Sequence, residues 1–161
     1  MGSRWARPAL ALLALGIMLA GEAAPAQGQR ARELGIGVVA TASDPALGAG
    51  MVYGALRTSR RVRISAAAGA GVSDGRAAWR AELLAHFLLS PQRKQGVGWY
   101  GAGGIAAVGG PVEQGYLVLT LGVEARPAGR EGWFVEGGVG GGARLAAGYR
   151  WRRFATTGAG R

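Results

Sequence analysis

The chain contains a single histidine, His86, and histidine is the side chain most often used for acid–base chemistry near neutral pH. A metal site would need further ligands, but the chain has no cysteine and the sequence around His86 supplies no obvious set of carboxylates. A serine nucleophile would have to lie beside the imidazole, yet Leu88 follows two positions later and Ser90 four positions later, in an expected turn. We therefore expect no catalytic residue, no metal and no cofactor, and we interpret His86 as a hydrogen-bonding residue of the interior or the rim.

A glycine pattern offers a second candidate for chemistry. The segment from Gly35 to Ala40 reads Gly-Ile-Gly-Val-Val-Ala and fits the G-x-G-x-x-A pattern of dinucleotide-binding loops. Such a loop must open a helix within a βαβ unit, because the helix N-terminus holds the pyrophosphate. Here Ser43-Asp44-Pro45 ends the run before a helix can form. We therefore expect no dinucleotide site.

Charged residues alternate with apolar ones near the end of the chain. Tyr149 and Trp151 share one side of the alternation, while Arg144, Arg150 and Arg152 share the other. Alternation with a period of two indicates a β-strand, since successive side chains leave the backbone on opposite sides. A strand with arginines on one face and apolar residues ending in aromatics on the other is typical of a transmembrane barrel, polar inside and apolar outside.

The rest of the chain divides into eight segments of this kind, separated by short stretches that contain glycine, proline, serine or aspartate. The expected strands are Glu33–Ala42, Gly48–Thr58, Arg61–Val72, Arg76–Leu89, Gly96–Val108, Gln114–Arg126, Gly132–Val139 and Arg144–Phe154. The fourth segment also has good helix propensity, but its charged residues alternate strictly, which favours a strand. The sequence therefore predicts an all-β chain, an eight-stranded antiparallel up-and-down transmembrane β-barrel.

The polar faces of these strands carry charges that would lie inside the barrel. A barrel of eight strands is just wide enough for side chains to fill it, and an unpaired buried charge is very costly. We therefore expect a network of ion pairs, with Glu82 against Arg63 or Arg80 and Glu136 against Arg144. The expected lumen network comprises Arg63, Arg80, Glu82, His86, Glu124, Arg126, Glu136, Arg144 and Arg150.

Aromatic residues fall near the ends of the expected strands rather than at their centres. Five lie next to the turns that follow even-numbered strands, whereas Trp79 and Tyr116 lie at the opposite rim, and Tyr53 is in the middle of a strand. A bilayer selects such belts because amphipathic rings settle at the headgroup level. The expected belts comprise Trp79, Phe87, Trp99, Tyr116, Trp133, Tyr149 and Trp151.

The first 26 residues have the features of a cleaved signal peptide. Arg4 and Arg7 form a basic region, residues 9–20 are apolar, and Ala24-Pro25-Ala26 supplies a small–x–small cleavage site before Gln27. No later stretch approaches the roughly 18 apolar residues that a spanning helix needs.

We accordingly expect residues 1–26 to be a signal peptide, 27–32 a polar leader, 33–154 the barrel and 155–161 a C-terminal tail. Removal of the signal peptide takes Arg4, Arg7 and Glu22 from 19 basic and nine acidic residues and leaves a net charge of +9. For an exported chain, this charge indicates an anionic membrane rather than nucleic acid as partner.

With this pattern of strands, belts and inward charges, residues 33–154 resemble the small eight-stranded outer-membrane barrels of the OmpA/OmpX type. The resemblance implies insertion by the barrel-assembly machinery, which reads an aromatic residue at the end of the last strand; here Phe154 would be that signal. It also implies contact with outer-membrane lipid and lipopolysaccharide. The chain departs from the family in the shortness of the turns after its odd-numbered strands.

Three functional hypotheses follow. The first is a non-enzymatic outer-membrane barrel with a structural or interaction role, an unknown external partner and a lumen filled by side chains. The second is a soluble exported lipocalin-like barrel, with its apolar rows inside around a small apolar ligand. The third is a lipid A-modifying barrel enzyme that uses His86, as some outer-membrane barrels use a His–Ser pair.

Overall fold

The computed structural model describes residues 31–154, which form eight β-strands. No helix in this part of the chain is long and apolar enough to cross a membrane. The strands are β1 (Ala31–Ala42), β2 (Leu47–Arg57), β3 (Val62–Ser73), β4 (Arg76–Leu88), β5 (Val97–Gly109), β6 (Gln114–Ala125), β7 (Glu131–Val139) and β8 (Ala143–Phe154).

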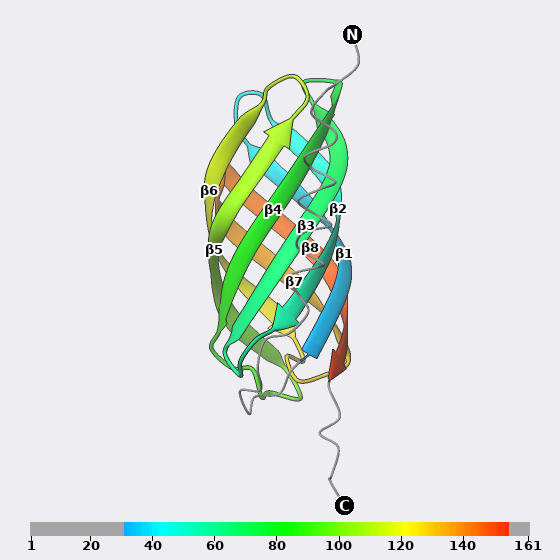
Figure 1. Cartoon of the computed structure of the whole chain (residues 1–161), viewed down its shortest axis with the longest axis vertical. Helices are drawn as coiled ribbons and strands as arrows, with labels where there is room; N and C mark the ends of the chain where they lie inside the picture. The colour runs from blue at the N-terminus through cyan, green and yellow to red at the C-terminus, as the bar shows by residue number, and fades with distance from the viewer. Residues whose placement is uncertain (1–30, 155–161) are drawn as a thin grey trace, which may run out of the picture.

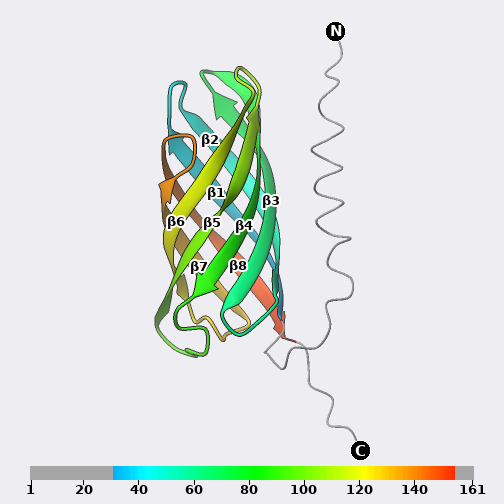
Figure 2. The same ribbon diagram turned by 60° about the vertical axis from the view of Figure 1, so that its left-hand side comes forward.

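The eight strands form one closed barrel in which each strand pairs antiparallel with its neighbours in the chain. Closure comes from pairing of β1 with β8, from Ala31 opposite Phe154 to Ala42 opposite Ala143. Figures 1 and 2 show the strands tilted steeply around an elongated barrel. Because every strand is paired on both sides, the sheet has no open edge with unpaired backbone groups.

Most of the strands are joined by short turns, and the tightest of these is explained by its residues. Between β3 and β4, Asp74 and Gly75 both have positive φ, 50° and 66°. Positive φ at both central residues is the mark of a type I′ turn, whose backbone twist matches that of the two flanking strands. Asp-Gly is among the preferred sequences of this turn. The chain therefore reverses here within two residues.

The predicted fold class is confirmed, and the predicted strand ends coincide with the observed ones or differ from them by one or two residues. The fourth segment is a strand, as its alternation indicated. β1 begins at Ala31, so the last two residues of the expected polar leader belong to the barrel. The expected signal peptide (1–26) and C-terminal tail (155–161) lie outside the described residues.

The barrel is apolar outside and charged inside. On β6, Leu117, Leu119 and Leu121 are 80%, 64% and 69% exposed, whereas the inward-facing Arg80 and Arg150 are each 1% exposed. A water-soluble barrel buries its apolar row, so this arrangement is the reverse of the one expected for a lipocalin-like carrier. The leucine row requires a solvent other than water.

The two ends of the barrel differ in which turns they carry. The lower end in Figure 1 holds the β2–β3, β4–β5 and β6–β7 turns, the start of β1 and the end of β8. The upper end holds the β1–β2, β3–β4, β5–β6 and β7–β8 turns.

Candidate functional site

The lower half of the lumen holds a cluster of two glutamates and four arginines, which we call the lower cluster. Glu33 of β1 accepts from Arg57 Nε at 2.7 Å. Glu124 of β6 accepts from Arg63 Nη1 at 2.9 Å and from Arg150 Nη1 at 2.7 Å. Arg152 of β8 donates to the same Glu124 oxygen through Nη2 and also lies beside Glu33. The cluster consists of Glu33, Arg57, Arg63, Glu124, Arg150 and Arg152.

The upper half of the lumen holds a second group, with two arginines and two glutamates, which we call the upper cluster. It consists of Arg80, Glu82, Glu136 and Arg144. Arg80 Nε donates to Glu82 Oε1 at 2.6 Å. Arg144 bridges two carboxylates, with Nη2 donating to Glu82 at 2.9 Å and Nη1 donating to Glu136 at 2.9 Å. The structure therefore brings together the pairs that the sequence suggested, Glu82 with Arg80 and Glu136 with Arg144.

Tyr100 joins the two clusters. Its hydroxyl donates to Glu136 Oε1 at 2.9 Å, and Arg150 Nη2 lies 3.4 Å from the same hydroxyl. Tyr100 is completely buried on the inner row of β5. One chain of polar contacts consequently runs along most of the lumen.

Aromatic rings enclose the guanidinium of Arg150. Its Cζ lies 4.3 Å from the ring centre of Phe134 and 5.6 Å from those of Tyr53 and Tyr100. Cations are attracted to ring faces, most strongly where water is excluded. These rings compensate part of the charge of an arginine that is 1% exposed.

Each of these three rings lies over a glycine of the neighbouring strand. Tyr53 is paired with Gly35, Tyr100 with Gly122, and Phe134 with Gly148. A Cβ on Gly122 would be 2.5 Å from Tyr100 Cζ, and one on Gly148 would be 2.7 Å from Phe134 Cε1. Glycine is required at such positions because a ring occupies the space that a side chain would take.

His86 is buried within the lower half of the lumen and contacts two inward-facing side chains of β3. Arg63 Nη2 lies 3.2 Å from Nδ1, and Ser65 Oγ lies 2.8 Å from Nε2. An arginine can only donate, so Nδ1 accepts and Nε2 carries the proton that is donated to Ser65. A hydrolase needs the opposite polarity, with Nε2 accepting the serine proton and a carboxylate behind Nδ1. The direction of the hydrogen bond from His86 to Ser65 therefore favours a structural role for His86.

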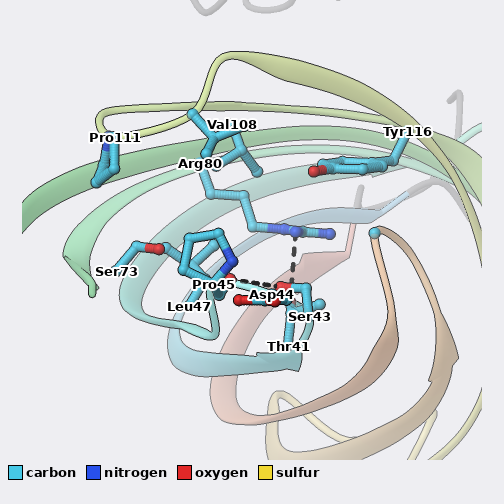
Figure 3. A pocket seen from close by; sticks show the side chains of 12 residues that line it. Thr41, Ser43, Asp44, Pro45, Leu47, Ser73, Arg80, Val108, Pro111 and Tyr116 are labelled. Atoms are coloured by element: carbon cyan, nitrogen blue, oxygen red, sulfur yellow. Dashed lines mark hydrogen bonds between the residues drawn. The ribbon is translucent and has the colours of Figure 1, made fainter.

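The upper mouth contains a small pocket of about 30 Å³. Figure 3 shows the Arg80 side chain crossing it, with Thr41 Oγ1 3.4 Å from Nη1. Tyr116 also lines this pocket, across the Arg80 side chain from Thr41, and a Cβ on Gly141 would be 2.9 Å from its ring. The assignment of Tyr116 to the lipid-facing belt is therefore wrong, because its inner-row position puts the ring over the mouth of the lumen.

The lower mouth is closed by the turn between β6 and β7. Arg126, expected in the lumen network, is about half exposed and lies 3.9 Å from the equally exposed Glu131. That expectation is wrong because the backbone takes φ 46° at Arg126, so the strand alternation ends one residue earlier. Pro127 follows and is completely buried, and its carbonyl accepts from Arg57 Nη2 at 2.8 Å.

The other expected belt residues lie on the outer wall. Towards the lower end, Phe87, Trp99, Trp133 and Trp151 are exposed, and Tyr149 packs against Trp151 with ring centres 5.4 Å apart. Trp79, near the upper end, is only partly exposed, since its indole lies over Gly109 of β5. Phe154 shares the inner row of Arg152, and the guanidinium of Arg57 lies 5.8 Å from its ring centre.

Several residues of the network were not predicted. Arg152 lies on the polar face of the last strand but is absent from the expected network. Glu33 follows from the same alternation, since Leu34 and Ile36 occupy the other face of β1. The remaining omissions lie on glycine-rich strands or carry no charge. They are Tyr53, Arg57, Ser65 and Tyr100.

Comparison with known proteins supports the fold. The sequence matches no protein-family model and no curated protein. Among solved structures, the N-terminal β-barrel domain of Pseudomonas aeruginosa OprF is similar, with a TM-score of 0.58 and 16% sequence identity. The match covers 79% of this chain and all of the OprF domain. The fold is that of a small OmpA-type barrel. At 16% identity the comparison informs on the fold and not on the network inside it.

Proposed function

We propose that this chain is a non-enzymatic outer-membrane β-barrel with a structural or interaction role in a bacterial envelope. The observation that carries the proposal is the outer row of β6, where three leucines face outward while arginines and glutamates fill the lumen. A bilayer provides the apolar surroundings that such a wall requires, and a closed barrel leaves no backbone group unpaired in lipid. The filled lumen argues against a general pore.

Cell fractionation with gel migration tests this proposal. We expect the protein in the outer-membrane fraction, and we expect an unheated sample to migrate differently from a boiled one because the barrel stays folded in detergent. Recovery in the soluble periplasmic fraction, with the same migration before and after boiling, would contradict the proposal.

The charge of the two ends suggests an orientation. The upper end exposes Asp44, Asp74 and Glu113 with the single cation Arg76. At the lower end, the exposed charged side chains are basic except for Glu131. The basic residues are Arg32, Arg60, Arg61, Arg93, Lys94, Arg126, Arg130 and Arg153.

These cations lie beyond the aromatic belt of the lower end, at the depth where phospholipid phosphates are found. We therefore place the lower end at the inner leaflet and the periplasm, and the upper end at the lipopolysaccharide surface. Insertion by the barrel-assembly machinery with Phe154 as the signal, after export through a signal peptide, is part of the same proposal. Nucleic acid is not expected as a partner.

Lysine labelling tests the orientation, because Lys94 is the only lysine of the chain. A membrane-impermeant amine reagent is expected to label the protein in lysed cells but not in intact cells. The matched control is Arg76→Lys at the upper end, which should be labelled in intact cells. Labelling of the unmodified protein in intact cells would reverse the assigned orientation.

The enzymatic alternative depends on His86, whose polarity towards Ser65 is the wrong one for a base. We expect the lipid A species of cells that express the protein to be the same with His86→Ala as with the unmodified chain. A change in lipid A that requires both His86 and Ser65 would restore the alternative.

A further inference from the structure

The buried charges of the lumen do not balance. Six arginines and four glutamates of the two clusters are each at most 6% exposed, which leaves an excess of two positive charges. The upper cluster is even, with two of each sign, so the whole excess belongs to the lower cluster. An uncompensated buried cation is costly, and the excess calls for further negative charge or strong dipoles.

Two of the four arginines of the lower cluster find such dipoles at the mouth. Arg57 donates to the carbonyl of Pro127, and Arg152 donates to the carbonyls of Arg126 and Gly129. These acceptors all belong to the β6–β7 turn that closes the lower end. The other two arginines, Arg63 and Arg150, have no carbonyl partner of this kind among the described residues.

Arg63 and Arg150 lie deeper and share the same two carboxylates. Nη1 of each approaches both Glu33 and Glu124. Within the described part of the chain, Arg150 Nε has no hydrogen-bond acceptor although the residue is 1% exposed. The hydroxyl of Tyr53 is likewise buried without a partner among these residues.

A cavity of about 50 Å³ lies against these groups. Arg63, Arg150, Tyr53, Ser65 and His86 line it. Arg144, Glu82 and Glu136 of the upper cluster line it too, but they are paired with one another or with Arg80 and Tyr100. The remaining wall is mostly apolar, including Met51, Leu84 and Phe134. By volume the cavity holds roughly three or four water molecules, and thus also one halide ion.

We infer that this cavity binds a small monovalent inorganic anion, of the size of chloride, next to Arg63 and Arg150. The anion neutralises part of the excess charge of the lower cluster and accepts from donors that the protein leaves unpartnered. Its apolar surroundings strengthen the attraction, since the local dielectric constant is low. The inference concerns the lumen alone and does not depend on the membrane that surrounds the barrel.

The test is unfolding of the purified, detergent-folded barrel in sodium chloride and in sodium gluconate at equal ionic strength. Gluconate is too large for the cavity, so it controls for screening. A ligand that binds only the folded state lowers the unfolding equilibrium constant about 100-fold when its concentration reaches about 100 times its dissociation constant. We expect chloride to protect in this saturable way, bromide to replace it, and gluconate to have no such effect.

Two variants of Met51, which lines the cavity, separate charge from volume. Met51→Glu places a carboxylate in the cavity and should abolish the protection by chloride, whereas the similarly sized Met51→Gln should retain it. Anomalous scattering from crystals grown in bromide provides a readout on the unmodified protein if Met51→Glu does not fold. Coinciding chloride and gluconate curves, or a cavity without a bromide peak, would overturn the inference and leave water as the occupant.

Discussion

The hydroxyl of Tyr100 donates to Glu136 at 2.9 Å and thereby connects the upper cluster to the lower one across the middle of the lumen. The two residues come from β5 and β7, which are separated by β6, so the contact ties together two strands that do not pair directly. The lumen network thus stabilises the barrel from the inside, since the outer face of the wall packs against no other part of the described chain.

Tyr100→Phe removes this connection without removing the ring. We expect the free energy of unfolding in lipid vesicles to fall by about 1–3 kcal/mol, because Glu136 Oε1 loses its only hydrogen-bond donor among the described residues. Tyr116→Phe is the control, since the Tyr116 hydroxyl bonds to Gln114 at the exposed rim and should cost little. Equal effects of the two substitutions would contradict the role given to Tyr100.

Glu82→Gln tests the buried ion pairs. It leaves Arg80 and Arg144 facing an uncharged amide, and breaking a buried pair of this kind costs about 3–5 kcal/mol. Glu131→Gln makes the same chemical change in the exposed pair with Arg126 and should cost less than about 0.5 kcal/mol. Urea titrations of the two variants in the same vesicles compare the costs, and a loss at residue 82 as small as that at residue 131 would show that the network contributes little.

Gly122→Ala tests the pairing of aromatic rings with glycines. The new methyl group would meet the Tyr100 ring, and overpacking of this sort costs about 1–3 kcal/mol. At Gly48, also in a strand, an added Cβ meets nothing within 4 Å, so Gly48→Ala is the matched control. The same vesicle unfolding assay should separate the two; a neutral Gly122→Ala would mean that the ring has room to move aside.

The strand alternation was sufficient to predict the fold and most of the network. In a barrel, the parity of a residue, its odd or even position along the strand, decides whether its side chain faces the lumen or the lipid. Arg80, Glu82 and Arg150 lie within strands and follow this rule. Arg126 does not, because a single residue with positive φ ends the strand and turns its side chain to the solvent. Parity also put Tyr116 on the inner row, and only its aromatic character suggested the belt.

Pairing over long distances was harder to predict than parity. Glu33 and Glu124 each contact arginines from several strands, and these contacts depend on the tilt and closure of the barrel. Alternation places a charge in the lumen but gives no depth relative to strands on the opposite wall. The aromatic enclosure of Arg150 also depends on these depths, so strand alternation does not predict it.

Leu119→Arg tests whether the outer wall lies in the hydrocarbon of a bilayer. An arginine at the midplane of a bilayer costs about 2–4 kcal/mol and at an interface about 0–1 kcal/mol. We therefore expect a large loss of stability in vesicles for Leu119→Arg, in the middle of β6, and a small one for Val72→Arg, near the upper end of β3. Similar small losses at both positions would mean that the wall is not in hydrocarbon.

The most direct measurement of the lipid-facing wall uses the fact that the chain has no cysteine. A fluorescent label is placed on Leu119→Cys, and separately on Lys94→Cys in the β4–β5 turn, and the proteins are folded into phospholipid vesicles. We predict that nitroxides at the bilayer midplane quench the label at residue 119 and not the one at residue 94, and that aqueous iodide does the reverse. Quenching of residue 119 by iodide, without quenching by the lipid nitroxide, would contradict the account.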